Sequence, residues 1–188
     1  MNFFIDTSNT KLVLILEHNN IIIDSLIMEN QFKVSDIVFT EIEKFLQKNN
    51  LTLKNLKNLY TTRGPGSYTG IRVAITILKT LKLINPFYNI FLISSLAFQA
   101  ELNDSISILD AKGNKSYIGI YSKGENIILD QLVPNELIEE FKQQFPNYQV
   151  KKDYENINFE QYFLKLKNYF KNIENIENIE PLYIKHFI

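Results

Sequence analysis

The chain has 188 residues with 20 basic and 21 acidic side chains, a length that suits one domain or two small ones. Apolar residues make up 45% of it, as in folded globular chains, and the net charge of −1 lacks the basic excess of most nucleic-acid-binding domains. The absence of cysteine excludes disulfides, thiolate metal sites and a cysteine nucleophile. No apolar run approaches the roughly 18–20 residues of a membrane span, and residues 1–6 lack the features of a signal peptide, so we expect a cytoplasmic protein.

The first half of the chain alternates short strands with amphipathic helices. Apolar and β-branched runs predict strands at 2–6, 11–17 and 21–28, of which the last two are joined by an asparagine turn. Apolar residues at helical spacing then predict helices over 34–46 and 69–84, each followed by a further strand, at 59–62 before the second helix and at 90–93 after it. Ser94 or Ser95 can cap a third helix that runs to about residue 102.

The second half begins the same order again. Strands are predicted at 105–110, 115–121 and 126–130, then a helix at 136–144, a strand at 148–150 and a helix over 159–170. Residues 172–180 repeat Asn-Ile-Glu and are interpreted as a linker. In each half the first strand ends in aspartate, Asp6 or Asp110. This duplicated βββαβα plan predicts an α/β fold of the actin/Hsp70-like (ribonuclease H-like) class, with an N-terminal lobe at 1–103 and a shortened second lobe at 104–188.

A glycine-rich segment follows the strand at 59–62. It reads Gly-Pro-Gly-Ser-Tyr-Thr-Gly over residues 64–70, with Arg72 in the first turn of the helix. Backbone N–H groups at such a helix start can hold an anion. The segment is neither a Walker A loop nor a Gly-x-Ser-x-Gly nucleophile elbow, and its third glycine stands one residue late for Gly-x-Gly-x-x-Gly. A tight connection that needs close backbone approach is the favoured interpretation over a phosphate site.

The segment from Asp6 to Thr10 is the second candidate for chemistry. In the actin-like plan the aspartate of the first strand faces a metal–nucleotide site, and a glycine in the following hairpin lets the backbone approach the phosphates. Here Asp6-Thr7-Ser8-Asn9-Thr10 contains no glycine, and the alternative is that Asp6 caps a turn. With no histidine or second acid placed beside Asp6 or Asp110, no catalytic constellation can be assembled and no metal site is predicted.

The two helices of the first half carry more apolar surface than a one-sided helix needs. Over 69–84 the apolar positions occupy roughly twice the usual arc, and the helix over 34–46 is similarly wide. Either the two helices pack against each other within one chain, or they present a shared apolar surface to another subunit.

Five motifs occur along the chain in one order. They are Asp-Thr-Ser at 6–8, the glycine segment at 64–72, Ser-Ser-Leu at 94–96, Leu-Asp-Ala-Lys at 109–112 and Pro-Leu-Tyr-Ile-Lys at 181–185. In this the chain resembles the TsaB (YeaZ) family along nearly its whole length. The resemblance implies an actin-like fold and a role in making threonylcarbamoyladenosine, next to the anticodon of tRNAs that read codons beginning with A.

The resemblance also implies partners. Family members are not the catalyst; they bind the catalytic subunit TsaD through helices equivalent to 34–46 and 69–84, and the pair recruits the ATPase TsaE. Isolated members can form homodimers through the same helices, and tRNA is engaged through the complex. The expected interface includes Ile37, Glu41, Thr69, Val73, Ile77 and Ile84, of which the last three are expected to point away from the chain's own sheet. We expect no cofactor on this chain alone, and ATP with a divalent metal in the assembled complex.

Two rival functions come from other classes. A small ATP-dependent phosphotransferase would use the candidate phosphate loop, which is expected to be vestigial and comprises Asp6, Thr7, Ser8, Gly64, Gly66, Ser67 and Arg72. The missing glycine after Asp6 disfavours this function. A peptidase is disfavoured because no histidine, cysteine or usable serine nucleophile is in place.

Overall fold

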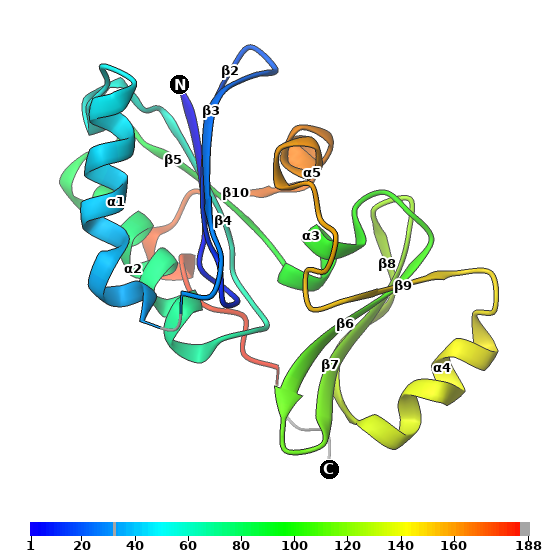
Figure 1. Cartoon of the computed structure of the whole chain (residues 1–188). Helices are drawn as coiled ribbons and strands as arrows, with labels where there is room; N and C mark the ends of the chain where they lie inside the picture. The colour runs from blue at the N-terminus through cyan, green and yellow to red at the C-terminus, as the bar shows by residue number, and fades with distance from the viewer. Residues whose placement is uncertain (32, 185–188) are drawn as a thin grey trace.

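The computed structural model describes residues 1–31 and 33–184, so Lys185, which closes the motif at 181–185, lies outside them. Two sheets with their helices form two lobes (Figure 1). The first lobe contains β1 (Asn2–Asp6), β2 (Leu12–His18), β3 (Ile21–Met28), α1 (Val34–Lys48), β4 (Asn58–Thr62), α2 (Tyr68–Ile84), β5 (Asn89–Ile93) and α3 (Ser95–Ala100). The rest of the chain forms β6 (Ser105–Lys112), β7 (Lys115–Ser122), β8 (Glu125–Pro134), α4 (Ile138–Gln144), β9 (Gln149–Lys152), α5 (Phe159–Leu166) and β10 (Lys171–Ile173). Short 3₁₀ turns are found at Leu53–Asn55, Asn135–Leu137, Lys167–Tyr169 and Ile176–Asn178.

The first sheet has the strand order β10-β5-β4-β1-β2-β3. β2 pairs antiparallel with both β1 and β3, whereas β1, β4 and β5 are parallel. The carboxyl ends of the parallel strands therefore lie at one edge, and Asp6 and Thr62 end neighbouring strands there.

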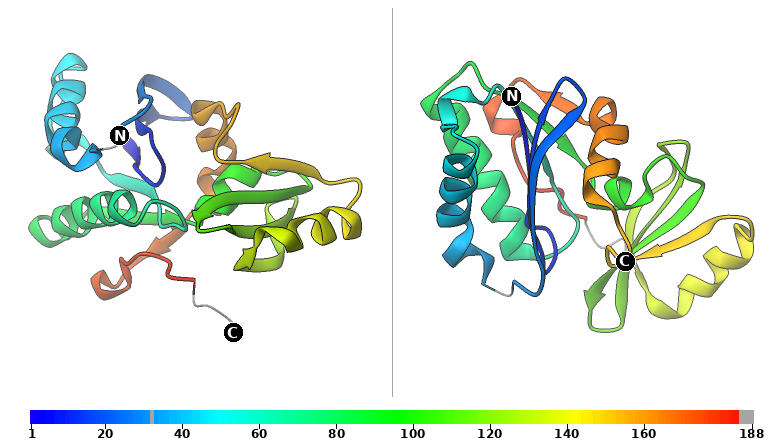
Figure 2. Two further views of the ribbon diagram at one scale, coloured as in Figure 1. Left: turned by 60° about the horizontal axis from the view of Figure 1, so that its bottom comes forward. Right: turned by 45° about the horizontal axis from the view of Figure 1, so that its top comes forward.

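Residues of β1 and β2 alternate between two cores because successive side chains of a strand point to opposite faces. Phe3 and Ile5 enter the core that α1 and α2 cover. Phe4 enters the second core, where its ring stacks on Phe98 of α3 and Phe163 of α5 at centroid distances of 5.2 and 5.1 Å. Figure 2 shows α1 and α2 side by side on one face of this sheet and α5 on the other.

The second sheet has the order β8-β7-β6-β9. This repeats the first sheet's order β3-β2-β1-β4 and stops before a counterpart of β5. Its outer face packs against α4 and carries a core of Ile106, Ile108, Ile118, Ile120 and Val133. The predicted duplicated actin-like fold with a shortened second copy is therefore confirmed, and the missing piece is the fifth strand. No helix within 1–31 and 33–184 is long and apolar enough to cross a membrane.

The chain returns to the first sheet at its end, which the sequence did not predict. Residues 171–173 form β10, which pairs antiparallel with β5 and places Lys171 opposite Leu92. Ile176 and Ile179 then pack against the core beneath α2. The predicted linker at 172–180 is therefore wrong, because this segment includes an edge strand and two core contacts. The division of the chain at residue 103 stays a prediction, and in space the last described residues belong with the first lobe.

Hydrogen bonds of one buried side chain hold the two lobes together. The Nε2 atom of Gln99 on α3 lies 2.8 Å from Ser107 Oγ and 3.0 Å from the carbonyl oxygens of Ile108 and Lys151. Its Oε1 atom accepts the backbone N–H of Tyr154 at 2.6 Å. Because an unpaired buried amide would cost about 1–3 kcal/mol, this network favours one fixed arrangement of α3 on the second sheet.

Candidate functional site

The glycine segment closes against the turn between β1 and β2. Ser67 is the N-cap of α2: its side-chain oxygen accepts the N–H of Gly70 at 3.2 Å, while its own backbone N–H donates to the Ser8 carbonyl at 2.7 Å. A β-carbon on Gly66, which has φ +151°, would stand 2.3 Å from that same carbonyl. Of the backbone N–H groups at this helix start, that of Ser67 is thus engaged by the β1–β2 turn and that of Gly70 by the Ser67 side chain.

Asp6 is fully buried beneath this contact. Its Oδ1 atom accepts the N–H of Ser8 at 2.6 Å and the Ser8 hydroxyl at 2.7 Å, and its Oδ2 atom accepts the Thr62 hydroxyl at 2.9 Å. Burial raises the pKa of the Asp6 carboxyl, and the hydrogen bonds from Ser8 and Thr62 offset only part of that effect. Asp6 thus caps the turn that follows β1, which is the alternative to a nucleotide site that the sequence predicted.

The remaining members of the candidate phosphate loop are Thr7, Gly64 and Arg72, and only Arg72 lies away from the turn. The hydroxyl of Thr7 donates to the Gly70 carbonyl at 2.6 Å, which ties the turn to α2 a second time. Gly64 has φ +98° and packs beside Ile71. Arg72 is exposed on α2, where its guanidinium donates to the Tyr68 hydroxyl and lies 5.1 Å from the ring centroid. The structure therefore brings Asp6, Thr7, Ser8, Gly66 and Ser67 together and leaves Arg72 on the outer face.

A groove runs along the outer side of α1 and α2. It has a volume of about 410 Å³ and is lined by Ser35, Phe39, Tyr68, Thr69, Arg72, Val73, Thr76 and Ile77. Phe39, on α1, is 66% exposed, and Tyr68 and Thr69 at the start of α2 are also exposed. Exposed apolar side chains that lie together around a groove, as Phe39 and Tyr68 do here, are typical of a surface that another molecule covers.

The expected interface residues occupy three different settings. Thr69 and Ile84 are exposed, Ile84 at 76%. Ile37, Glu41 and Val73 are partly buried, and Glu41 forms an ion pair with Lys44 at 2.8 Å. Ile77 is only 5% exposed and belongs to the first core although it also lines the groove, so the prediction that it faces outward as a free surface residue is wrong. The reason is that α1 packs against the flank of α2 and covers an arc that solvent would otherwise reach.

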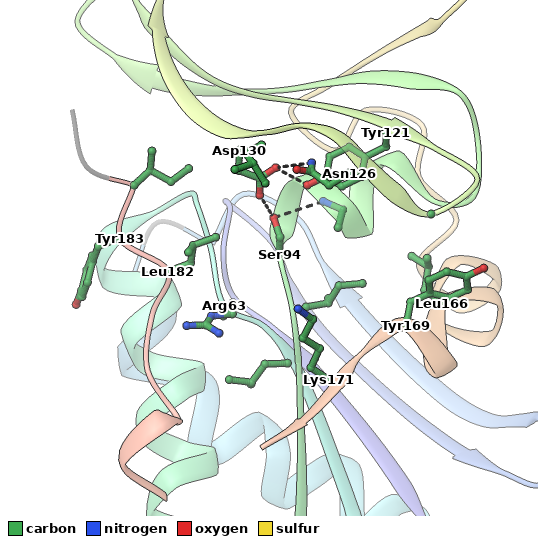
Figure 3. A pocket seen from close by; sticks show the side chains of 16 residues that line it. Arg63, Ser94, Tyr121, Asn126, Asp130, Leu166, Tyr169, Lys171, Leu182 and Tyr183 are labelled. Carbon is green, nitrogen blue, oxygen red and sulfur yellow. Dashed lines mark hydrogen bonds between the residues drawn. The ribbon is translucent and has the colours of Figure 1, made fainter. Parts of the chain in front are cut away.

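A second hollow, which no sequence motif predicted, lies between the two lobes. It has a volume of about 690 Å³ and receives residues from β5, α3, β10, the β7–β8 hairpin and the segment 182–184. On its upper wall Asp130 accepts hydrogen bonds from Ser94, Tyr121 and Asn126 (Figure 3). Burial raises the pKa of the Asp130 carboxyl against the lowering effect of these donors. The side chains of Arg63 and Lys171 extend into the space below this network (Figure 3). Within residues 1–31 and 33–184 there is no cluster of three or more His, Asp or Glu side chains that could hold a metal.

Residues 33–172 match the family model TsaD, described as tRNA N6-adenosine threonylcarbamoyltransferase. A Mycoplasma pneumoniae protein called "uncharacterized protein MG208 homolog" is 31% identical over 176 residues, which is 93% of this chain and 88% of that protein. The tRNA threonylcarbamoyladenosine biosynthesis protein TsaB of Bacillus subtilis is 29% identical over 136 residues, or 70% of this chain and 59% of that protein. Among solved structures, YeaZ from Pseudomonas aeruginosa superposes with a TM-score of 0.74 at 16% identity, covering 97% of this chain and 99% of that one.

The matched family model, which spans well over half of the chain, and the two-lobed actin-like fold define the class of protein: a member of the wider TsaD family. Within this class the chain belongs to the TsaB (YeaZ) family, as its named relatives show. Its fold is that of the solved YeaZ structure.

Proposed function

We propose that this protein is a non-catalytic subunit in the biosynthesis of threonylcarbamoyladenosine in tRNA. It binds a TsaD-type catalytic subunit through α1 and α2 and supports transfer of the threonylcarbamoyl group to the adenosine next to the anticodon, in tRNAs reading codons that begin with A. Membership of the TsaB family supports the pathway, since relatives from Bacillus subtilis and Buchnera aphidicola are named for it. The pair recruits a TsaE-type ATPase, with ATP and a divalent metal bound in the assembled complex.

The closed turn beneath the glycine segment is the observation that carries the non-catalytic role. In an actin-like nucleotide site the aspartate that ends the first strand faces the metal and the phosphates. Here the Asp6 oxygens accept hydrogen bonds from Ser8 and Thr62, and the Ser8 carbonyl occupies the space beside Gly66. Opening this site would break buried hydrogen bonds, each worth about 1 kcal/mol net and more where a charged group is involved.

The groove along α1 and α2 is the feature that supports subunit binding. Its exposed Phe39 stands beside the apolar floor formed by Val73 and Ile77. Ile84, at the C-terminal end of α2, is a further exposed apolar side chain. Two helices contributed by each subunit would pack as a four-helix bundle, in which a few buried apolar side chains supply most of the affinity.

Co-purification tests the proposed docking face. The chain is co-expressed with the TsaD homologue of its own organism, and Phe39→Glu is compared with Ile127→Glu, which alters a half-exposed isoleucine on β8 in the other lobe. Phe39→Glu should weaken association at least tenfold, because it would bury an unpaired charge at the interface. Ile127→Glu should bind as the wild type does. If Phe39→Glu folds and still co-purifies in full, α1 and α2 are not the docking surface.

Two further measurements bear on the alternatives. Calorimetric titration of the isolated chain with Mg-ATP should give no tight binding, whereas tight binding would support a phosphotransferase. Sedimentation of the isolated chain should show a homodimer that Phe39→Glu dissociates, if copies of the chain use the same face in the absence of TsaD.

A further inference from the structure

The cleft between the lobes has the size and composition of a small-molecule site. Its volume of about 690 Å³ falls within the roughly 300–1,000 Å³ typical of ligand pockets. It shares no lining residue with the groove on α1 and α2, so the cleft and the proposed docking face are separate sites.

Two cations face the interior of this cleft. The Nε atom of Arg63 is buried and has no hydrogen-bond partner within the described residues. Neither Arg63 nor Lys171 forms an ion pair with an acidic side chain in that part of the chain. A buried donor without an acceptor costs about 1–3 kcal/mol, more when the group is charged, and an anionic oxygen bound in the cleft would satisfy it.

The position of Arg63 is fixed by the backbone around it. Its N–H donates to the Ile93 carbonyl at 2.8 Å, and its own carbonyl accepts the N–H of Leu182 at 2.7 Å. Arg63 is therefore held between the end of β5 and residues 182–184, which also line the cleft. A guanidinium placed on a fixed backbone loses less freedom on binding than one on a mobile loop.

The carboxyl group of Asp130, which also lines the cleft, already accepts hydrogen bonds from neighbouring side chains. Asp130 accepts hydrogen bonds from the Ser94 and Tyr121 hydroxyls, and the side-chain amide of Asn126 lies 3.4 Å from its Oδ1 atom. These contacts hold it on the opposite wall, as Figure 3 shows. Among the described residues Asp130 forms no ion pair with Arg63 or Lys171.

The rest of the lining is largely apolar. Leu129 on β8 is 77% exposed, and Tyr169 is also exposed at the cleft. Leu92 and Leu166 complete the apolar wall beneath them. Covering such side chains releases about 25 cal/mol for each Å² removed from water, so an apolar ligand body would add to the affinity supplied by the cations.

We propose that the interlobe cleft binds a small amphipathic organic acid, whose anionic head is held by Arg63 and Lys171 and whose apolar body lies on Leu129 and Tyr169. The ligand class follows from two cations that have no acidic partner among the described residues and that line a mostly apolar hollow.

A matched pair of probes tests this site. 4-Phenylbutanoate and its neutral amide, 4-phenylbutanamide, have nearly the same shape and differ in charge. Titration of the full chain, followed by calorimetry and by NMR shifts, should show saturable binding of the carboxylate with a Kd of about 10 mM or tighter, and binding of the amide at least tenfold weaker.

Three variants locate the binding. Arg63→Met and Lys171→Met should each weaken binding of the carboxylate several-fold or more, and Lys171, exposed on an edge strand, offers a test that does not depend on the fold tolerating Arg63→Met. Lys115→Met removes the same charge from an exposed position at the far end of β7 and should leave binding unchanged. The proposal is overturned if the carboxylate and the amide bind equally, if Lys115→Met weakens binding as much as Lys171→Met does, or if no saturable binding occurs.

Discussion

Thr7 and Gly70 are in backbone contact across two elements that are 63 residues apart in sequence. The Thr7 hydroxyl donates to the Gly70 carbonyl at 2.6 Å, and a β-carbon on Gly70 would lie 1.8 Å from the Thr7 carbonyl oxygen. Glycine at this helical position lets α2 approach the β1–β2 turn closely enough to form that bond.

Gly70→Ala should therefore destabilise the protein by about 3 kcal/mol or more, because backbone atoms on both sides must move. Chemical denaturation measures the change. Gly113→Ala is the matched control: a β-carbon there would have no atom within 4 Å, and its φ of +61° should cost only about 1–2 kcal/mol. Equal losses in the two variants would show that α2 can withdraw from the turn without strain.

Ser67→Ala should lower stability by about 1 kcal/mol through loss of the N-cap of α2. We expect tRNA modification by the reconstituted complex to remain close to wild type, since this hydroxyl accepts only the N–H of Gly70 among the described residues. Thermal and chemical denaturation measure the first effect and a modification assay the second. More than tenfold loss of modification in a folded variant would give the Ser67 hydroxyl a direct role that the cap does not explain.

Asp6→Asn should change how stability depends on pH. Burial raises the pKa of Asp6 in the folded state above its usual value of 3.8, so the folded protein holds this proton more tightly than the unfolded chain does. The contribution of Asp6 to stability is therefore largest at low pH and falls as the pH rises from about 4 through the folded pKa. Since asparagine does not ionise, the variant should gain stability relative to wild type as the pH increases over that range.

Denaturation of both proteins at several pH values measures this difference. A difference that does not vary with pH would contradict a raised pKa for Asp6. The same variant should leave modification by the reconstituted complex nearly intact if the turn has only a structural role. Loss of modification in an assembled complex would favour a catalytic chain.

Ile77→Glu and Phe39→Glu should differ in their effect on the stability of the monomer. Ile77 lies in the first core, so a buried unpaired carboxylate there should destabilise the monomer by about 3–5 kcal/mol. Phe39 is mostly exposed, and its replacement should change monomer stability by about 0.5 kcal/mol or less. Circular dichroism during urea titration separates the two. A stable Ile77→Glu monomer would show that α1 and α2 can part without loss of the core.

The sequence predicted β1 and β2 well because successive side chains of these strands enter two different cores, one on each face of the sheet. Both strands are therefore apolar runs that can be recognised in the sequence. The prediction failed at β10, where Lys171 and Asn172 are exposed and the strand is held by backbone pairing with β5. A strand held by backbone hydrogen bonds does not need a periodic pattern of apolar side chains, so the sequence shows no such pattern there. The place of Ile77 was missed for a related reason: helical periodicity gives the width of an apolar stripe but not which neighbour covers each part of it.

The glycine segment and Asp6 were recognised from sequence because their residues are adjacent or recur in a known plan. The cleft was not, since Arg63, Asp130 and Lys171 come from three distant segments and match no motif. The signals available were weak ones: an arginine directly before the glycine segment, and an aspartate directly after the apolar run at 127–129.

The return of the chain to β5 has a consequence for dividing this protein into parts. A fragment ending at residue 103 would contain every helix and strand of the first predicted lobe, yet β5 would become an open edge and Phe4 and Tyr60 would lose their contacts with Phe163 and Phe170. Exposed, apolar edge strands pair with copies of themselves. Such a fragment should self-associate into insoluble material, and restoring residues 159–173 through a short artificial link should make it soluble. Solubility of the two fragments would then measure how far α5 and β10 protect the first lobe from aggregation.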